Sequence, residues 1–493
     1  MQRNPSCVTN NFHDSVHCVW LKGSEVVIVG VVNHVSLTDA KPAVYWLDDP
    51  AKPAPLPPLL GVASADLVVV GGGYSGLWTA LLARVRFPSW SVVLLEAGQC
   101  GDQASGRNGG FAEASLTHGF WNGLERWPDE LATLDRLGQD NLNEMAATIE
   151  EHGIDCDWQL TGALNVATRP HEVDDLAEWS TALTEHGIKH RLLDETGARD
   201  ELRSPTYLGG LEVVGDTATI EPARLAWGLR QACLDSGVVI HEGSAVTGLE
   251  RDGSGMRVST IAGSVRAGRV ALATNAFPPL LRRLRMMTVP VYDYVLMTEP
   301  LSAAQMDAIG WANRQGVSDS ANHFHYYRLT RDNRILWGGY DAIYHFGSKI
   351  SPELETGATH DKLAGHFFET FPQLEGLRFT HRWAGIIDTC TRFSAFFGKA
   401  YAGRVAYALG YTGLGVGATR FGAQVMLDLL GGEQTERTSL EMVRSKPLPF
   451  PPEPARYAGI SMMVRSLGKA DANGGRRDLF LRTMDRLGLG FDS

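Results

Sequence analysis

The chain has no apolar run long enough to cross a membrane. Its stretch VVIVGVV, residues 26–32, is much shorter than the roughly 20 apolar residues that a transmembrane helix requires. The first twenty residues also lack the apolar core of a secretory signal. These absences predict a cytoplasmic protein without a membrane span.

Paired cysteines and a strong basic charge are absent as well. The six cysteines show neither a CxxC pair nor a regular spacing, which predicts reduced thiols and no metal site. The formal net charge is −11, whereas binding of nucleic-acid phosphates requires a concentrated basic face. We therefore expect no nucleic-acid partner.

Glycine, by contrast, is in excess. The chain has 54 glycines, against roughly 35 for average usage. Glycine tolerates positive φ and lets the backbone approach a ligand closely, so the excess suits a protein that binds a nucleotide cofactor. At 493 residues the chain is too long for a single core of ordinary size, and we expect two domains.

A βαβ unit is predicted near the start of the ordered chain. Residues 65–70 and 91–96 are typical of buried parallel strands, with a helix between them. The turn GGGYSG, residues 71–76, has GxGxxG spacing, which lets the backbone approach a pyrophosphate at a helix N-terminus. Glu96 ends the second strand, where a carboxylate accepts the hydroxyl hydrogens of an adenosine ribose. This combination indicates NAD or FAD.

The rest of the chain also alternates between strand and helix patterns. Residues 121–200 are mostly helical by pattern, and residues 221–237 predict one more helix. Four short strands between residues 238 and 274 predict a β-meander. Alternating segments between residues 290 and 400 predict a mixed sheet in a second domain, and residues 405–432 are again typical of strand, glycine-rich turn and helix.

Four further segments carry a resemblance. They are ASGRNGGF (104–111), SAVTGLE around Val246, RVALATNAF (269–277) and GYTGLGVGATRFGA (410–423). Together with the first glycine-rich turn, and in this order, they resemble the D-amino-acid-oxidase-type FAD-dependent oxidoreductases, most closely the gamma-glutamylputrescine-oxidase-like amine oxidases.

The resemblance implies an α/β fold of two interleaved domains. One is a discontinuous Rossmann-like FAD-binding domain of the glutathione-reductase type, and the other is a substrate domain of mixed sheet and helices. The implied division is an N-terminal extension and proline-rich lead-in (1–64), the FAD-binding domain (65–120, 216–285 and 380–432), the substrate domain (121–215 and 286–379) and a C-terminal helical tail (433–493).

FAD is the implied cofactor. The residues that match the family's cofactor-binding segments are Gly71, Gly73, Tyr74, Ser75, Gly76, Glu96, Ser105, Gly106, Arg107, Asn108, Gly109, Gly110, Val246, Thr274, Asn275, Gly413, Leu414, Gly415 and Thr419. Sarcosine oxidases tether FAD through a cysteine at a position where this chain has Gly385. We therefore expect noncovalent FAD.

The implied reaction is oxidation of an amine or amino acid. Hydride passes from the α-carbon to flavin N5, the imine hydrolyses, and molecular oxygen reoxidises the flavin. RILWGGYD, residues 334–341, lacks the lysine that sarcosine oxidases use near the flavin for oxygen activation, so an amine dehydrogenase with another acceptor stays open. A non-catalytic flavoprotein subunit also stays open, as does an NAD-dependent dehydrogenase, which leaves residues 104–111 and 410–423 unexplained.

Three residues are candidates for the catalytic, substrate-facing side. Tyr326 and Arg328 share one face of the predicted strand HFHYYRLT, and Arg382 lies on the strand that the resemblance directs toward the flavin. Two interpretations of the strand HFHYYRLT stay open: one of its faces meets the flavin, or its aromatic residues pack within the sheet. An arginine suits a substrate carboxylate, and a structural ion pair explains it equally well. The motifs carry no information on oligomeric state.

Overall fold

The structure is a computed structural model that describes residues 19–22, 25–28 and 34–488. Parts of the predicted N-terminal extension and the last residues of the predicted tail, 489–493, lie outside the described residues, as do Cys7 and Cys18. Strands β1 (Val19–Lys22) and β2 (Glu25–Ile28) pair antiparallel with each other.

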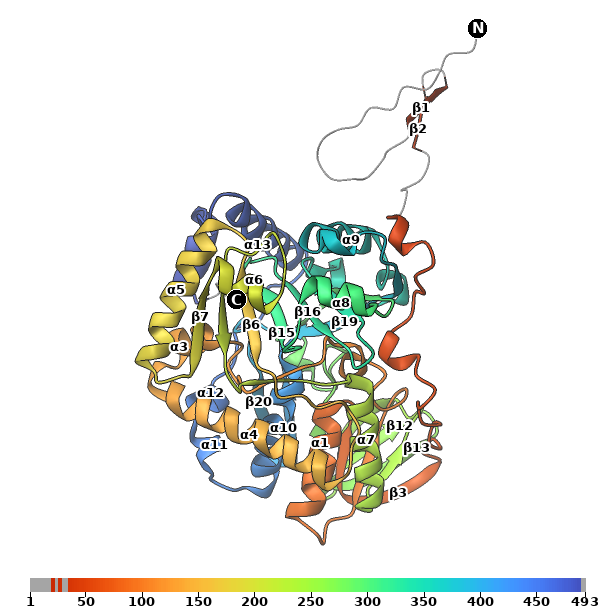
Figure 1. The fold of residues 1–493 in the computed structure, drawn as a ribbon. Coiled ribbons are helices and arrows are strands. Elements are labelled where there is room, and N and C mark those ends of the chain that lie inside the picture. The colour runs from red at the N-terminus through yellow and green to blue at the C-terminus, as the bar shows by residue number, and fades with distance from the viewer. Residues whose placement is uncertain (1–18, 23–24, 29–33, 489–493) are drawn as a thin grey trace.

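Two large sheets organise the fold, one in the lower and one in the upper half of Figure 1. The eight-stranded sheet contains β3 (Gly61–Val70), β4 (Val92–Leu95), β10 (Val239–His241), β11 (Val246–Asp252), β12 (Gly255–Thr260), β13 (Gly263–Leu272), β20 (Phe396–Ala400) and β21 (Val405–Leu409). The nine-stranded sheet contains β6 (Ala163–Ala167), β7 (His190–Asp194), β8 (Gly209–Val213), β14 (Val289–Thr298), β15 (Gly316–Asp319), β16 (His325–Leu329), β17 (Ile335–Gly339), β18 (Ile343–Tyr344) and β19 (Phe379–Thr389). Strands β5 (Phe111–Glu113) and β9 (Thr217–Thr219) form a short ribbon.

Fourteen α-helices lie among the described residues. They are α1 (Tyr74–Arg86), α2 (Ala104–Arg107), α3 (Phe120–Arg126), α4 (Leu131–Glu151), α5 (Pro170–Glu185), α6 (Glu195–Glu201), α7 (Pro222–Asp235), α8 (Ala303–Ile309), α9 (Ala358–Thr370), α10 (Gly415–Gly431), α11 (Glu436–Ser439), α12 (Glu441–Arg444), α13 (Ala455–Ala472) and α14 (Leu479–Arg486). Within the described part of the chain, none of them combines the length and apolar character needed to cross a bilayer.

The eight-stranded sheet has a parallel centre, in the order β10–β4–β3–β13–β21. The apolar runs at the end of β3 and along β4 are buried on both faces, on one by helices and on the other by a cluster that includes Met256 and Val258 of β12. The predicted βαβ unit is thus confirmed as β3–α1–β4. The predicted four-strand meander is confirmed for β11–β13 only: β10 leaves helix α7 and pairs parallel with β4, because a strand–helix–strand crossover returns the chain to a parallel position.

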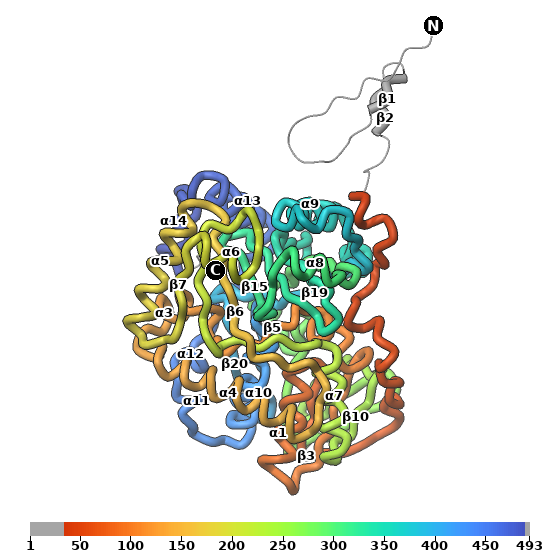
Figure 2. The backbone as a smooth tube through the Cα atoms, in the orientation of Figure 1, coloured from red at the N-terminus to blue at the C-terminus, as the bar shows by residue number. Residues whose placement is uncertain are grey.

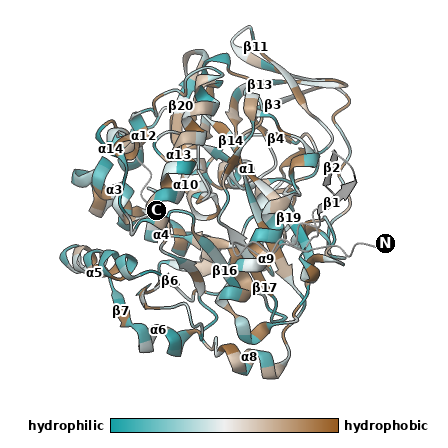
Figure 3. Ribbon diagram, turned by 90° about the horizontal axis from the view of Figure 1, so that it is seen from above, coloured by the Kyte–Doolittle hydropathy of each residue, from teal (hydrophilic) through white to brown (hydrophobic). Residues whose placement is uncertain are grey.

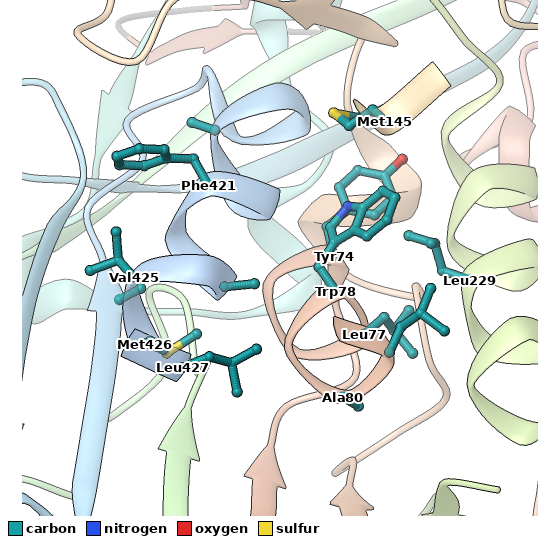
Figure 4. Packing of buried hydrophobic residues seen from close by; sticks show 14 of the residues in the cluster. Tyr74, Leu77, Trp78, Ala80, Met145, Leu229, Phe421, Val425, Met426 and Leu427 are labelled. Carbon is teal, nitrogen blue, oxygen red and sulfur yellow. The ribbon is translucent and has the colours of Figure 1, made fainter. Parts of the chain in front are cut away.

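Helices α1, α7 and α10 build the core beneath this sheet. Figure 4 shows Leu77 and Trp78 of α1 between Leu229 of α7 and the apolar side chains of α10, among them Phe421 and Val425. All five side chains are buried. At roughly 1.5–3 kcal/mol for each large apolar side chain, this burial fixes the N-terminal ends of α1 and α10 on one side of the sheet.

The nine-stranded sheet is mixed, as predicted. Its longest pair is β14 with β19, which run antiparallel with Asp293 opposite Gly385. The outer helices α5 and α6 carry mostly polar residues and are largely teal in Figure 3. The region 121–200 is mainly helical, but it also contributes β6 and β7, which the sequence pattern did not indicate.

Segments far apart in the chain meet in the lower half of the molecule. In Figure 2 the orange, green and blue parts of the tube lie together there, as expected for a discontinuous domain. Strand β19 lies across the predicted domain boundary at residue 380, and its partner β14 belongs to the nine-stranded sheet. The domain division itself stays a prediction.

Candidate functional site

A cavity of about 2030 Å³ lies where the two sheets meet. Its walls come from the glycine-rich turns beside α1 and α10, from the α2 loop, from β14 and β19, and from the C-terminal tail. A site for one drug-sized ligand is typically about 300–1,000 Å³. The cavity therefore has room for a dinucleotide and a substrate together.

The turn between β3 and α1 forms one end of this cavity. Gly71 has φ +107°, and a Cβ atom there would lie 2.3 Å from the carbonyl oxygen of Ala273. At Gly76 a Cβ atom would lie 1.8 Å from the Gly71 carbonyl oxygen, so this glycine lets α1 pack directly on the turn. Because Gly71 and Gly73 line the cavity, the N-terminus of α1 is open to an anionic ligand.

Glu96 lies at the end of β4, beside this turn. Its Oε2 accepts a hydrogen bond from the Gly72 amide at 2.6 Å, and its Oε1 accepts one from the Gly98 amide at 2.8 Å. Burial raises the pKa of its carboxyl group. Each oxygen keeps a second lone pair, which suits the two hydroxyl groups of a ribose.

The α2 loop is held rigidly from behind. The Asn108 side chain donates to the Ala104 carbonyl at 2.9 Å and accepts from the Gly110 amide at 2.9 Å. The Trp46 indole donates to the Asn108 carbonyl at 3.0 Å, and the Trp383 indole donates to the Arg107 carbonyl at 2.8 Å. These bonds hold the loop from the side away from the cavity, which Ser105, Arg107 and Gly109 line.

A second glycine-rich turn precedes α10. The buried carboxylate of Asp388 accepts from the backbone amides of Gly410 and Tyr411, and burial raises its pKa to about 7. These bonds orient the turn so that Gly413 and Gly415 line the cavity at the helix N-terminus. Amides in this position stabilise negative charge on a neighbouring ligand.

The cavity brings together most of the predicted site residues. Those that line it are Gly71, Gly73, Tyr74, Ser75, Glu96, Ser105, Arg107, Asn108, Gly109, Val246, Thr274, Asn275, Tyr326, Gly413, Leu414, Gly415 and Thr419. Those that do not line it are Gly76, Gly106, Gly110, Arg328 and Arg382. The glycines of the second group serve close packing, as Gly110 shows with a virtual Cβ 2.3 Å from the Ile220 carbonyl oxygen.

The two predicted arginines lie behind the cavity wall. Arg328 is completely buried, its guanidinium lies 5.2 Å from the centre of the Trp46 ring, and burial lowers its pKa to about 10. Its three guanidinium nitrogens make no hydrogen bond to any of the described residues. Arg382 pairs with Leu296 across the sheet, and its backbone amide donates to the Lys41 carbonyl at 2.9 Å. The catalytic roles of both stay predictions.

Tyr326 does line the cavity, with a partner that the sequence analysis missed. Its hydroxyl group donates to the Asp293 carboxylate, and both side chains face the same space. The pattern Tyr-Asp-Tyr at residues 292–294 contained the signal, because alternation in a strand places Asp293 opposite its two tyrosine neighbours.

The contribution of the predicted C-terminal helical tail to the cavity is a second feature that the sequence did not indicate. Phe450, Met463, Leu467 and Phe480 line the cavity. Asp471 anchors the tail by accepting the backbone amides of residues 322 and 323 at 2.9 and 3.0 Å. The tail therefore forms part of the cavity wall.

Comparisons with known proteins agree with this geometry. Residues 66–429 match the DAO family, described as FAD dependent oxidoreductase. The chain belongs to this family. It is 32% identical over 400 residues to gamma-glutamylputrescine oxidoreductase of Escherichia coli, which covers 79% of this chain and 89% of that protein.

Other relatives give the same picture. The probable oxidoreductase OrdL of Haemophilus influenzae is 30% identical over 408 residues, with 80% of this chain and 89% of that protein covered. The crystal structure of glycine oxidase from Geobacillus kaustophilus superposes with a TM-score of 0.65 at 21% identity, over 78% of this chain and 99% of that one. The predicted α/β fold and the predicted family are thus confirmed, and the protein is an FAD-dependent oxidoreductase.

The residues of the cavity fit FAD. The backbone of the first glycine-rich turn is open for a pyrophosphate, Glu96 for the ribose, and the α2 loop and the second turn for a flat ring system. When bound, the flavin supplies the hydride acceptor, and the protein supplies orientation and charge.

Proposed function

We propose that the protein oxidises the carbon–nitrogen bond of an amine. Hydride passes to N5 of FAD, the imine hydrolyses in water, and molecular oxygen reoxidises the cofactor. The observation that supports this best is that one cavity is lined both by the predicted FAD-binding residues and by the half-buried Asp293–Tyr326 pair. The relative that acts on gamma-glutamylputrescine supports the same class of substrate.

The cavity favours an amine over an amino acid. A substrate carboxylate is normally held by an arginine fork. Of the described arginines that line the cavity, Arg107 pairs with Glu355 at 2.8 Å, Arg136 pairs with Glu436 at 2.5 Å, and Arg477 pairs with Asp485 at 2.7 Å. The fourth, Arg456, donates to the Pro451 carbonyl at 3.0 Å. None of these four is free of an internal partner.

We further propose that FAD is bound noncovalently. Cys390 lines the cavity, but its thiol is fully buried and donates to the Ser394 carbonyl at 3.2 Å. Burial raises its pKa, which makes it a poor nucleophile. We also propose a cytoplasmic location. Cys100, Cys156, Cys233 and Cys390 are free thiols in the described structure, and reduced thiols are typical of cytoplasmic proteins.

The test is an anaerobic flavin-reduction screen. The yellow holoprotein is mixed with polyamines, gamma-glutamylated amines, N-methylglycine and both enantiomers of several amino acids, and the flavin absorbance is followed. We expect bleaching by at least one amine and no bleaching by amino acids. Bleaching by none of these compounds contradicts the proposal and favours a non-catalytic flavoprotein.

The electron acceptor is tested by following the same flavin absorbance. Reduced enzyme is mixed with air-saturated buffer and, separately, with an artificial quinone. Rapid reoxidation by oxygen with formation of peroxide is the expected result. Reoxidation by the quinone alone would make the protein a dehydrogenase, the alternative raised by the missing lysine in residues 334–341.

A further inference from the structure

Asp293 is the one half-buried residue of β14, and it borders the cavity. Its neighbours point to the opposite face of the sheet. The Tyr292 hydroxyl donates to the Ser351 carbonyl at 3.3 Å, and the Tyr294 hydroxyl donates to the Leu354 carbonyl at 2.8 Å. The strand thus presents a single carboxylate to the cavity between two tyrosines that are engaged elsewhere.

Glycines on two sides determine where Tyr326 lies. Its ring lies over Gly338 of β17, where a Cβ atom would be 2.6 Å from Cζ. Gly109 of the α2 loop covers another edge, with a virtual Cβ 2.7 Å from Cε2. Opposite Asp293 on β19 stands Gly385. The ring therefore crosses β17 without obstruction, and its hydroxyl group reaches the Asp293 carboxylate.

The charge of Asp293 is not balanced by a protein cation. None of the ion pairs among the described residues includes Asp293. The neighbouring strands contribute Gly338 and Gly385, and the guanidinium of Arg107, which lies beside Gly385, pairs with Glu355 at 2.8 Å. The remaining titratable neighbour is Tyr326, whose pKa burial and Asp293 raise well above 10, so it stays a hydrogen-bond donor.

We propose that Asp293 accepts the proton of the substrate ammonium group and that Tyr326 positions its carboxylate. The proposal rests on the proposed function. In this step one N–H bond of the bound ammonium breaks, the proton bonds to an Asp293 oxygen, and the electron pair stays on nitrogen. The neutral amine can then lose hydride from the adjacent carbon to FAD, the oxidant of the family.

The titration of Asp293 makes this step measurable. Burial raises the pKa of its carboxyl group to about 6, while the hydrogen bond from Tyr326 lowers it. The rate of anaerobic flavin reduction by an amine should therefore fall on the acid side of pH 6 in the wild type. Asp293→Asn should remove this acid limb and lower the rate at pH 8 by about 10²–10⁴-fold, the range of general-base catalysis.

Tyr326→Phe is the second variant. It keeps the carboxylate but removes the donor that stabilises its ionised form, so the acid limb should move to higher pH. Asp135→Asn is the matched control, because burial also raises the pKa of Asp135 to about 6, but this residue lies on α4 and makes no bond to Tyr326. The rate of flavin reduction in Asp135→Asn should fall at the same acidic pH as in the wild type.

A measurement without turnover completes the test. The infrared difference between wild type and Asp293→Asn should show one carboxyl band that titrates near pH 6. An unchanged acid limb in Asp293→Asn, or a band that titrates at the ordinary value of an aspartate, overturns the proposal. Absence of flavin reduction in the wild type overturns the proposed function and this step with it, whereas reduction with an unchanged limb in the variant overturns this step alone.

Discussion

Gly76 provides a sharp test of how the cofactor turn is built. It does not line the cavity, yet a methyl group there would lie 1.8 Å from the Gly71 carbonyl oxygen and 3.3 Å from Val69 Cγ1. Neither contact can relax easily, because Gly71 is itself fixed at φ +107° against Ala273. In Gly76→Ala, α1 must therefore move away from β3, and its N-terminus must move away from the pyrophosphate position.

The expected cost follows from this clash. Forcing one extra carbon into a packed interface typically costs about 1–3 kcal/mol. If half of this cost, about 0.5–1.5 kcal/mol, falls on the bound state, the Kd for FAD rises roughly two- to tenfold, since 1.4 kcal/mol corresponds to a factor of ten. Titration of apoprotein with FAD, followed by flavin fluorescence, measures this change.

Gly365→Ala is the control for this substitution. Gly365 lies within α9, its φ is not positive, and a Cβ atom there would meet nothing within 4 Å. An alanine in this helix should stabilise the protein by about 0.5–1 kcal/mol and leave FAD binding unchanged. Wild-type FAD affinity and thermal stability in Gly76→Ala would refute the reasoning.

Three further predictions concern the rest of the cavity. Gly338→Ala should displace the Tyr326 ring and slow flavin reduction by about 10²-fold in stopped flow, with FAD content unchanged. Burial raises the pKa of Glu113 from 4.5 to about 7, so between these pH values the folded state holds a proton that the unfolded state releases. The free energy of unfolding therefore falls as pH rises from 4.5 to about 7, and Glu113→Gln should reduce this fall when thermal unfolding is measured across that range. Asp471→Ala leaves the half-buried amides of Asn322 and His323 without their acceptor, which costs at most about 1–3 kcal/mol and should speed proteolysis of the tail.

Local pattern sufficed for the cofactor half of the fold. The β3–α1–β4 unit follows from an apolar run, a glycine turn and an amphipathic helix that are contiguous in sequence. Strand β7 could not be found in this way, because it lies at the edge of its sheet and is mostly exposed, so it lacks an apolar alternation. Strand β10 was placed in the wrong neighbourhood because strand pairing is decided by the crossover through α7 and not by distance along the chain.

The same division applies to the site. The position of Glu96 was predictable, because dinucleotide-binding folds have a carboxylate at a fixed spacing after the glycine-rich turn, and the structure places it against the Gly72 amide. Its role in ribose binding stays a prediction. Asp293 was not predictable as a site residue, because what marks it is its hydrogen bond with Tyr326. Tyr326 lies 33 residues away in the sequence, on a strand that does not pair with β14. Only the pairing β14–β17–β16 and the missing side chain of Gly338 bring the two groups into contact.

The two ends of the cavity are therefore built on different principles. The end beside the two glycine-rich turns, where FAD binding is predicted, offers backbone amides that depend on glycines and their spacing, and the family match over residues 66–429 covers it. The opposite end relies on side chains, including Phe450, Met463 and Phe480 of the tail, which lies beyond that match. If the substrate binds beside Asp293, as proposed, substitutions at Phe450, Met463 or Phe480 should change the volume and polarity of the cavity without touching either glycine-rich turn.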